Sequence, residues 1–270
     1  MDIAIGYDIA LNVTGPTLIL GALSVHPSLE PQLHAPEQFS TSPALPFTRY
    51  LDAMGNRITH LPVPAGTTQV RLRSAAVIRN SGLPDAEPTG AQAHAVQDLP
   101  TEVLRFLLPS RYGDFDGELL NFAWQQFGQT APGWGLVRAI SDYVHQHIRF
   151  DYMQARPTRS ATEAWREGVG VCRDYAHLAV ALCRSMNLPA RYATGYLGDI
   201  GIAPTGTPGD FSAWFQVFVG GQWHTWDARH NVPRQGRTLM AYGRDAADVP
   251  ITMVFGNNEL AHFEVITDVV

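Results

Sequence analysis

The stretch Gly168–Leu178, GVGVCRDYAHL, contains one of the two cysteines in a chain of 270 residues. Gly168 and Gly170 form a turn before Cys172, and the apolar residues after it recur at the steps of three and four that predict a helix. The N–H groups and dipole of a first helical turn favour an anion, and Arg173 adds positive charge nearby. We therefore expect the pKa of this thiol to be lowered. To act as a nucleophile, Cys172 would also need a histidine to take its proton and an acid to orient that histidine.

Cys183 lies on the same predicted helix and provides a contrast. At 1.5 Å per residue the two cysteines would be about 16 Å apart, whereas a disulfide spans roughly 7 Å between Cα atoms. Apolar neighbours on its face predict that Cys183 is inert core. Two free thiols, together with a start that lacks a basic leader, predict a cytoplasmic protein.

The composition excludes several classes of partner. Hydrophobic residues make up 45% of the chain and charged residues 16%, as in ordinary globular proteins. The net charge of −6, without any run of Lys or Arg, argues against binding to nucleic acid. Thr14, Gly15 and Pro16 interrupt the first apolar run, so no membrane span is expected. We found no metal-ligand cluster and no phosphate-binding loop, so we expect neither a metal nor another cofactor; the oligomeric state is left open.

The two ends of the chain have different periodicities. Residues 1–85 alternate in short runs separated by Pro, Gly and Ser, which predicts an N-terminal antiparallel β-sandwich. Residues 86–100 continue a polar, proline-containing segment and are interpreted as a linker. Residues 101–270 are assigned to a second domain in which helices precede strands, an order typical of α+β proteins. Helices are predicted over 101–108, 117–128, 133–150, 160–168 and 172–186, and strands over 190–197, 213–228, 249–256 and 262–270.

A longer pattern surrounds the opening stretch. The run GVGVCRDYAHLAVALCRSMNLPARYATGYL is followed by a strand with Ala213-Trp214 and then by W-x-x-W-D-A. This pattern resembles the transglutaminase-like cysteine superfamily over about residues 100–250, and the β-rich start resembles the region that accompanies bacterial members. The resemblance implies a papain-like core of helices on an antiparallel sheet. It also implies a cofactor-free Cys-His-Asp triad, with Cys172 as the nucleophile and Asp227 as the acid.

The histidine of that triad is missing from its usual position. In the family it precedes Ala-Trp, but here Ser212 stands before Ala213-Trp214. A hydroxyl is too weak a base to take a proton from a thiol near neutral pH. A hairpin turn at Gly220-Gly221 would place Ser212 diagonal to Asp227 on one face, where a base would be held.

Three other histidines are candidates for the base. His224 is expected to point to the opposite face from Asp227, because side chains alternate along a strand. His177 lies about 140° around the helix from Cys172 and is expected to be a hydrogen-bonded structural residue. His230 follows the strand in the turn-forming sequence DARHN and could fold back, so it is the best substitute base.

Two functions remain open on the sequence. The first is thiol-dependent amide hydrolysis or acyl transfer on a peptide or protein substrate, with a thioester at Cys172 and the backbone N–H of Cys172 as one oxyanion donor. The second is a catalytically impaired fold that binds a peptide or protein; Ser212 favours it, whereas the retained Cys172 and Asp227 oppose it. A third reading is that Ser212 is an introduced replacement for the histidine.

Overall fold

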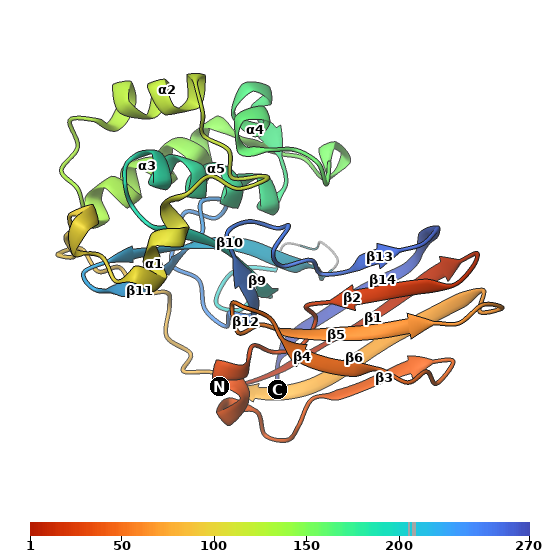
Figure 1. Ribbon diagram of the computed structural model, residues 1–270. Coiled ribbons are helices and arrows are strands. Elements are labelled where there is room, and N and C mark those ends of the chain that lie inside the picture. Colours follow the sequence, from red (N-terminus) through yellow and green to blue (C-terminus); the bar gives the residue numbers. More distant parts are fainter. Residues whose placement is uncertain (205, 207–208) are drawn as a thin grey trace.

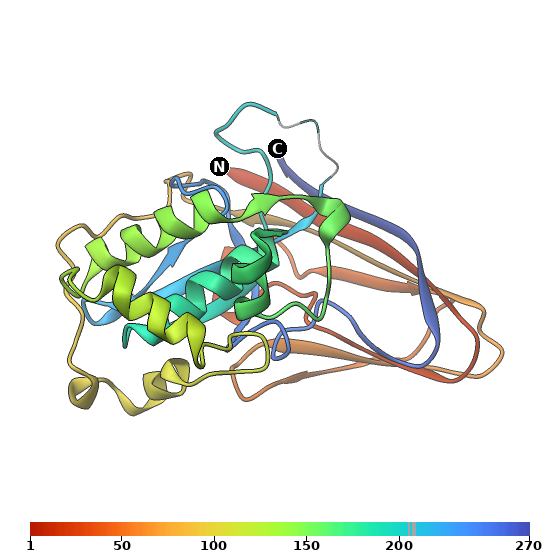
Figure 2. The same ribbon diagram turned by 90° about the horizontal axis from the view of Figure 1, so that it is seen from above.

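The computed structural model describes residues 1–204, 206 and 209–270. A layer of helices covers one face of a four-stranded sheet, and two longer antiparallel sheets extend away from it (Figure 1). Seen from above, the helices gather over one end of the molecule, and the long strands form the other end (Figure 2). The expected α+β architecture is confirmed.

Two four-stranded sheets form the β-rich part, and both are antiparallel. Their inner faces share one hydrophobic core, in which Ile9 and Val70 of one sheet join Ile19 and Leu61 of the other. The predicted sandwich is therefore present. In sheet order, its strands are β14 (Asn258–Val269), β1 (Asp2–Val13), β6 (Gln69–Arg79) and β3 (Gln38–Ser42), and then β13 (Met253–Phe255), β2 (Thr17–Gly21), β5 (Arg57–Val63) and β4 (Thr48–Leu51).

The last two strands of the chain belong to this sandwich. β14 pairs with β1 from Ile3 opposite Val269 to Val13 opposite Asn258, and β13 pairs with β2. These strands occur near the predicted ranges 249–256 and 262–270, but they do not join the sheet of the core to which residues 101–270 were assigned. Alternation predicts a strand without naming its partner, so the sequence missed this pairing. The boundaries 1–85, 86–100 and 101–270 stay a prediction.

The second part contains the predicted helices and a four-stranded antiparallel sheet of order β11-β10-β9-β12. The predicted helix over 101–108 is only a single α-helical turn followed by a 3-10 turn, and β12 was not predicted. The helical elements are α1 (Thr101–Leu104), η3 (Arg105–Leu107), α2 (Glu118–Phe127), α3 (Trp134–His147), α4 (Ala161–Glu167) and α5 (Cys172–Ser185). The strands are β9 (Ala190–Tyr196), β10 (Phe211–Val219), β11 (Gln222–Trp226) and β12 (Thr238–Gly243).

Helix α5 is the centre of this part. It packs on β10 and is surrounded by α2, α3 and α4, so its residues from Asp174 to Ser185 are all buried. Local signals in the sequence set the bounds of the preceding helix, α4: Ser160 and Glu163 form a capping box at its start, and Gly168 ends it at a φ of 62°. The start of α5 is therefore held in a fixed place against the sheet.

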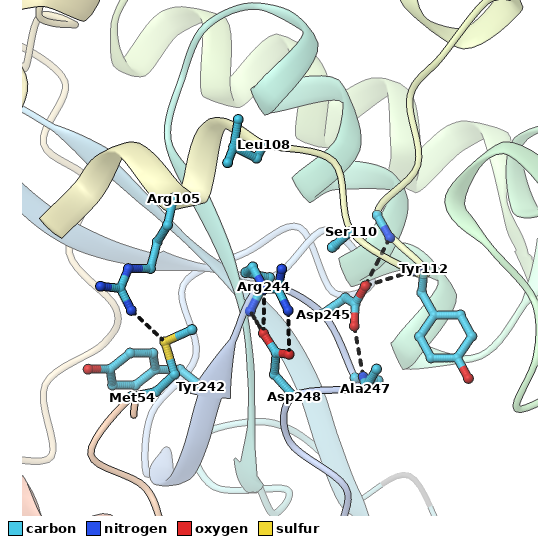
Figure 3. Close-up of polar contacts among 12 residues, drawn as sticks. Met54, Arg105, Leu108, Ser110, Tyr112, Tyr242, Arg244, Asp245, Ala247 and Asp248 are labelled. Carbon is cyan, nitrogen blue, oxygen red and sulfur yellow. Dashed lines mark hydrogen bonds and ion pairs between the residues drawn. The ribbon is translucent and has the colours of Figure 1, made fainter. Parts of the chain in front are cut away.

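A buried carboxylate fastens the loop after η3 to the end of β12. Asp245 is 1% exposed and accepts hydrogen bonds from the backbone N–H groups of Tyr112 (2.7 Å) and Ala247 (2.8 Å), as Figure 3 shows. Arg244 forms a separate bidentate pair with Asp248 beside it. These contacts connect the helical layer to the sheet away from the start of α5.

Candidate active site

The first turn of α5 is fixed by a buried ion pair. Asp174 accepts the backbone N–H of Val171 at 2.8 Å and the Nη1 of Arg159 at 3.0 Å, and both charged side chains are almost fully buried. Gly170 is required here, because a Cβ at this position would lie 2.5 Å from the carboxylate of Asp174. Cys172 lies between Gly170 and Asp174 in the sequence, so the ion pair holds it at the start of the helix.

Arg173 does not supply the charge that the sequence predicted beside the thiol. Its guanidinium donates to the main-chain carbonyls of Arg156 and Arg159 and lies 4.3 Å from the centre of the Tyr112 ring. It approaches Asp174 only to 3.8 Å. The reason is geometric, since consecutive helical residues project about 100° apart.

Cys172 is partly exposed, but protein atoms surround its sulfur. The thiol accepts a hydrogen bond from the backbone N–H of Ala213 on β10. Burial raises the pKa of Cys172 to about 11, with the charge of Arg229 opposing this shift and that of Asp210 adding to it. The predicted lowering of the pKa is thus not observed, because removal of water outweighs the nearby positive charge. The thiol is protonated at neutral pH.

Asp227 lies just beyond β11 and organises the turn that follows it. Its Oδ1 accepts the backbone N–H of Arg229 at 2.9 Å and that of His230 at 3.3 Å. The N–H of Asn231 returns to the carbonyl of Asp227 at 2.8 Å. This turn carries the His230 ring back to the carboxylate, where Nδ1 lies 2.8 Å from Oδ2 of Asp227. His230 thus has the folded-back geometry that the sequence allowed.

An arginine and a second aspartate support this pair. Arg237 donates through Nη2 to Asp227 at 3.2 Å and through Nε to Asp85 at 2.8 Å. Burial alone would raise the pKa of Asp227, but hydrogen bonds from His230 and the charge of Arg237 outweigh it and hold the pKa well below the usual range. The carboxylate is therefore ionised and can fix Nδ1 of His230 as the protonated nitrogen, leaving Nε2 as the basic one.

Ser212 occupies a buried position with unused hydrogen-bonding capacity. Its side chain is 6% exposed, and its hydroxyl has no partner among the residues that the structure describes. It directly precedes Ala213, which binds the thiol. The predicted hairpin register also holds, with Val219 opposite Gln222. The Ser212 side chain is therefore close to Cys172, but its hydroxyl makes no hydrogen bond to a described residue that could orient the thiol.

A cavity of about 330 Å³ adjoins these residues. Ser212 and His230 both line it, together with residues of the segment before β10 and of β14. Cys172 is not part of the wall, but its hydrogen bond to Ala213 places it next to the Ser212 wall residue. The volume is near the lower end of the range for small-ligand sites.

The other candidate histidines are structural. His177 is fully buried, accepts the N–H of Ala246 at 3.1 Å and stacks on Tyr112, so the expected structural role is confirmed. His224 lies opposite Val217 and packs against Trp134, on the helical side of the sheet. Neither ring lines the cavity.

Three further side chains pack inside the protein, and for Cys183 this role was expected. Cys183 is fully buried among the helices, and burial raises its pKa to about 12. The indole N–H of Trp226 donates to Ser141 at 2.9 Å. Trp214 is 2% exposed and lies beneath the guanidinium of Arg237.

The sequence missed several charged and polar residues of this site. Tyr152 and Arg229 both line the cavity and hydrogen-bond to each other. Tyr152 belongs to the short turn η4 (Tyr152–Gln154). This turn lies beside the start of α5 because β7 (Arg149–Phe150) pairs in parallel with β8 (Val169–Gly170). No local spacing predicts this contact. Asp210 could have been found, because it stands two residues before Ser212 and alternation places both on one face.

Within the described ranges, no group of three or more His, Cys, Asp or Glu residues could hold a metal ion. Among these same residues, no helix has both the length and the apolar character needed to cross a membrane.

Comparison with known proteins identifies the family. The model of the transglutaminase-like superfamily matches residues 123–228, which include Cys172, Ser212 and Asp227. The crystal structure of a candidate cysteine protease from Cytophaga hutchinsonii superimposes with a TM-score of 0.87 at 30% identity, covering 99% of this chain and 90% of that one. An uncharacterised protein of Mycobacterium leprae (strain TN) is 27% identical over 239 residues, which are 85% of this chain and 83% of that protein. The superfamily model and the match over nearly the whole chain together show that this protein belongs to the transglutaminase-like superfamily.

Proposed function

We propose that the protein is a cofactor-free thiol enzyme that cleaves or transfers the acyl group of peptide or protein amides. Cys172 is the nucleophile, and His230, oriented by Asp227, is the base that replaces the histidine missing at Ser212. The observation that carries this proposal is the contact of 2.8 Å between Nδ1 of His230 and Oδ2 of Asp227, at the wall of the cavity beside the thiol.

The protonated state of the thiol defines the order of events. Nε2 of His230 takes the proton of Cys172 as the sulfur attacks the carbonyl carbon of the amide, and the carbonyl oxygen becomes an oxyanion. The N–H of Cys172 belongs to the first turn of α5, where backbone donors are free to bind that oxyanion. Collapse breaks the C–N bond, and His230 returns the proton to the departing amine. Water or a second amine then resolves the thioester.

Its electrostatic environment supports His230 in this role. Asp227 is ionised and buried, so it stabilises the imidazolium that forms during attack. Arg237, which also pairs with Asp85, donates to the same Oδ2 of Asp227 and helps to hold the carboxylate in place. The similarity to the Cytophaga hutchinsonii candidate cysteine protease also favours hydrolysis as the first activity to assay.

The test is a panel of quenched fluorescent peptides assayed with the wild-type chain, Cys172→Ala and His230→Ala. We expect cleavage by the wild type, none by Cys172→Ala, and a loss of roughly 10²–10⁴-fold in kcat/KM for His230→Ala. A fluorescent primary amine in the same assay reports whether transfer competes with hydrolysis. Cleavage that is unchanged in His230→Ala would contradict the assignment of the base.

The second candidate function is peptide or protein binding without turnover. The raised pKa of Cys172 and the unpartnered hydroxyl of Ser212 favour it, since neither activates a nucleophile. Under this alternative, Cys172→Ala would bind the same peptides as the wild type, and no peptide would be cleaved by either protein.

A further inference from the structure

Carboxylates from two distant parts of the chain line the cavity beside Ser212. Asp210 immediately precedes β10, whereas Glu264 and Asp268 come from β14 of the sandwich. Asp210 is partly buried and has no ion-pair partner within the described part of the chain. Glu264 and Asp268 are exposed at the rim. The cavity thus has a partly buried anion within it and further negative charge at its edge.

The two arginines in the wall are already held by the protein. The guanidinium of Arg229 lies 3.8 Å from the centre of the Phe150 ring and hydrogen-bonds to Tyr152. Arg234 is 3% exposed and donates to the carbonyl of Gly198 at 2.8 Å. Neither forms an ion pair with Asp210, although the charge of Arg229 acts on it from a distance.

The position of Asp210 relative to the thiol matters for function. Burial raises the pKa of Asp210 to about 6, with a backbone hydrogen bond and Arg229 opposing the shift, so it is mostly ionised at neutral pH. Its charge in turn raises the pKa of Cys172. A carboxylate in partial burial, without a counterion, gains stability from a cation that enters the cavity.

We propose that this cavity binds a primary ammonium group of the acyl donor, with Asp210 as the main counterion and Glu264 and Asp268 attracting the charge from the rim. The proposal rests on the proposed function, because it places the ammonium on the molecule that Cys172 attacks. An ammonium held by a carboxylate is protonated, so it is a recognition group and not the amine that resolves the thioester. The bounded cavity, closed on one side by β14, suits one side chain or a chain end.

The first experiment needs no catalysis. The thiolate of Cys172 attacks a methanethiosulfonate reagent, forms a mixed disulfide and releases methanesulfinate, and the rate is followed by peptide mass spectrometry. The reagents are the cationic 2-aminoethyl and the anionic 2-sulfonatoethyl compounds, each normalised to its rate with free cysteine. We expect the cation to be preferred by roughly ten-fold or more, with the ratio falling toward one in Asp210→Asn but not in Asp98→Asn, an exposed control. An equal or reversed preference, or one that is kept in Asp210→Asn, would overturn the proposal.

The second experiment identifies the source of the ammonium with three matched peptide amides. Acetyl-lysyl and free-amino norleucyl substrates each carry one ammonium, on the side chain or on the chain end, and the acetyl-norleucyl substrate carries none. We expect one charged substrate to exceed the neutral one in kcat/KM by roughly ten- to hundred-fold, with the advantage lost in Asp210→Asn. Turnover without such an advantage would refute the subsite and leave the proposed function intact. Reagent preference at Cys172 without any turnover would refute the proposed function and support the cation site.

Discussion

At the scale of single residues, the site combines a protonated nucleophile with an oriented base. The sequence named Cys172, Asp227, Ser212 and His230, and the structure brings Ser212 and His230 to one cavity with Asp227 behind the histidine. Burial of the sulfur, however, raises the pKa of Cys172, and this effect outweighs the lowering expected from the helix N-terminus. The sequence could not weigh these two effects, because desolvation depends on which side chains pack around the thiol.

The titration of Cys172 tests this balance. Iodoacetamide reacts with the thiolate, so a pKa of about 11 predicts a labelling rate that still rises with each pH step up to pH 10. The labelling rate of a solvent-exposed thiol, such as free cysteine, has its midpoint near pH 8.5 and levels off above it, so this thiol serves as the control. A plateau for Cys172 below pH 8 would show a preformed thiolate and contradict general-base activation.

The proposal that His230 replaces the usual histidine of the family can be tested by placing a histidine at position 212. In a His230→Ala background, Ser212→His places a ring in the buried slot near the cavity, where Asp227 is free to orient it. A general base typically contributes 10²–10⁴-fold to the rate. We expect this double variant to recover at least about a tenth of that factor. Ser212→His alone should add little. Activity that is insensitive to both substitutions would mean that neither position holds the base.

At the scale of elements, the ion pair beneath the start of α5 fixes the nucleophile. The capping box of α4, the glycine stop and the hairpin turn were all predictable, because each depends on neighbouring residues alone. The pair of Asp174 with Arg159, in contrast, joins the first turn of α5 to the segment before α4. No local pattern in the sequence identifies Arg159 as the partner of Asp174.

Removal of one charge from this pair should destabilise the core. Asp174→Asn keeps an acceptor for Val171 but removes the buried counterion of Arg159, whose guanidinium then pairs only with the more exposed Glu167, and this costs about 1–3 kcal/mol. The free energy of unfolding in urea measures this loss. Asp116→Asn, at an exposed position, should change stability by less than about 0.5 kcal/mol. Equal stability of the two variants would contradict the role given to the pair.

At the scale of the whole molecule, the last strand connects the sandwich to the site. The sequence predicted the sandwich, the helical layer and the hairpin, since each has its own periodicity. It did not predict that β14 pairs with β1 and also lines the cavity, because long-range pairing leaves no local signal. The carboxylates of β14 were missed for the same reason.

The contact between β14 and the core depends on a glycine. A Cβ at Gly198 would lie 2.3 Å from the carbonyl oxygen of Thr267, so Gly198→Ala should push the two parts away from each other and cost about 1–3 kcal/mol. Thermal unfolding measures the loss. Gly90→Ala, which would meet no atom within 4 Å, is the matched control. A melting temperature in Gly198→Ala equal to that of the control would show that the contact is not tight.

The most direct test of the central claim is the rate at which Cys172 is acylated by p-nitrophenyl acetate at pH 7, measured by peptide mass spectrometry in the wild type and in His230→Ala. Cys183 serves as an internal control. We predict an acetyl thioester at Cys172 that forms roughly 10²-fold or more faster in the wild type than in His230→Ala. Equal rates in the two proteins, at the level of Cys183, would contradict the assignment of Cys172 and His230 as nucleophile and base.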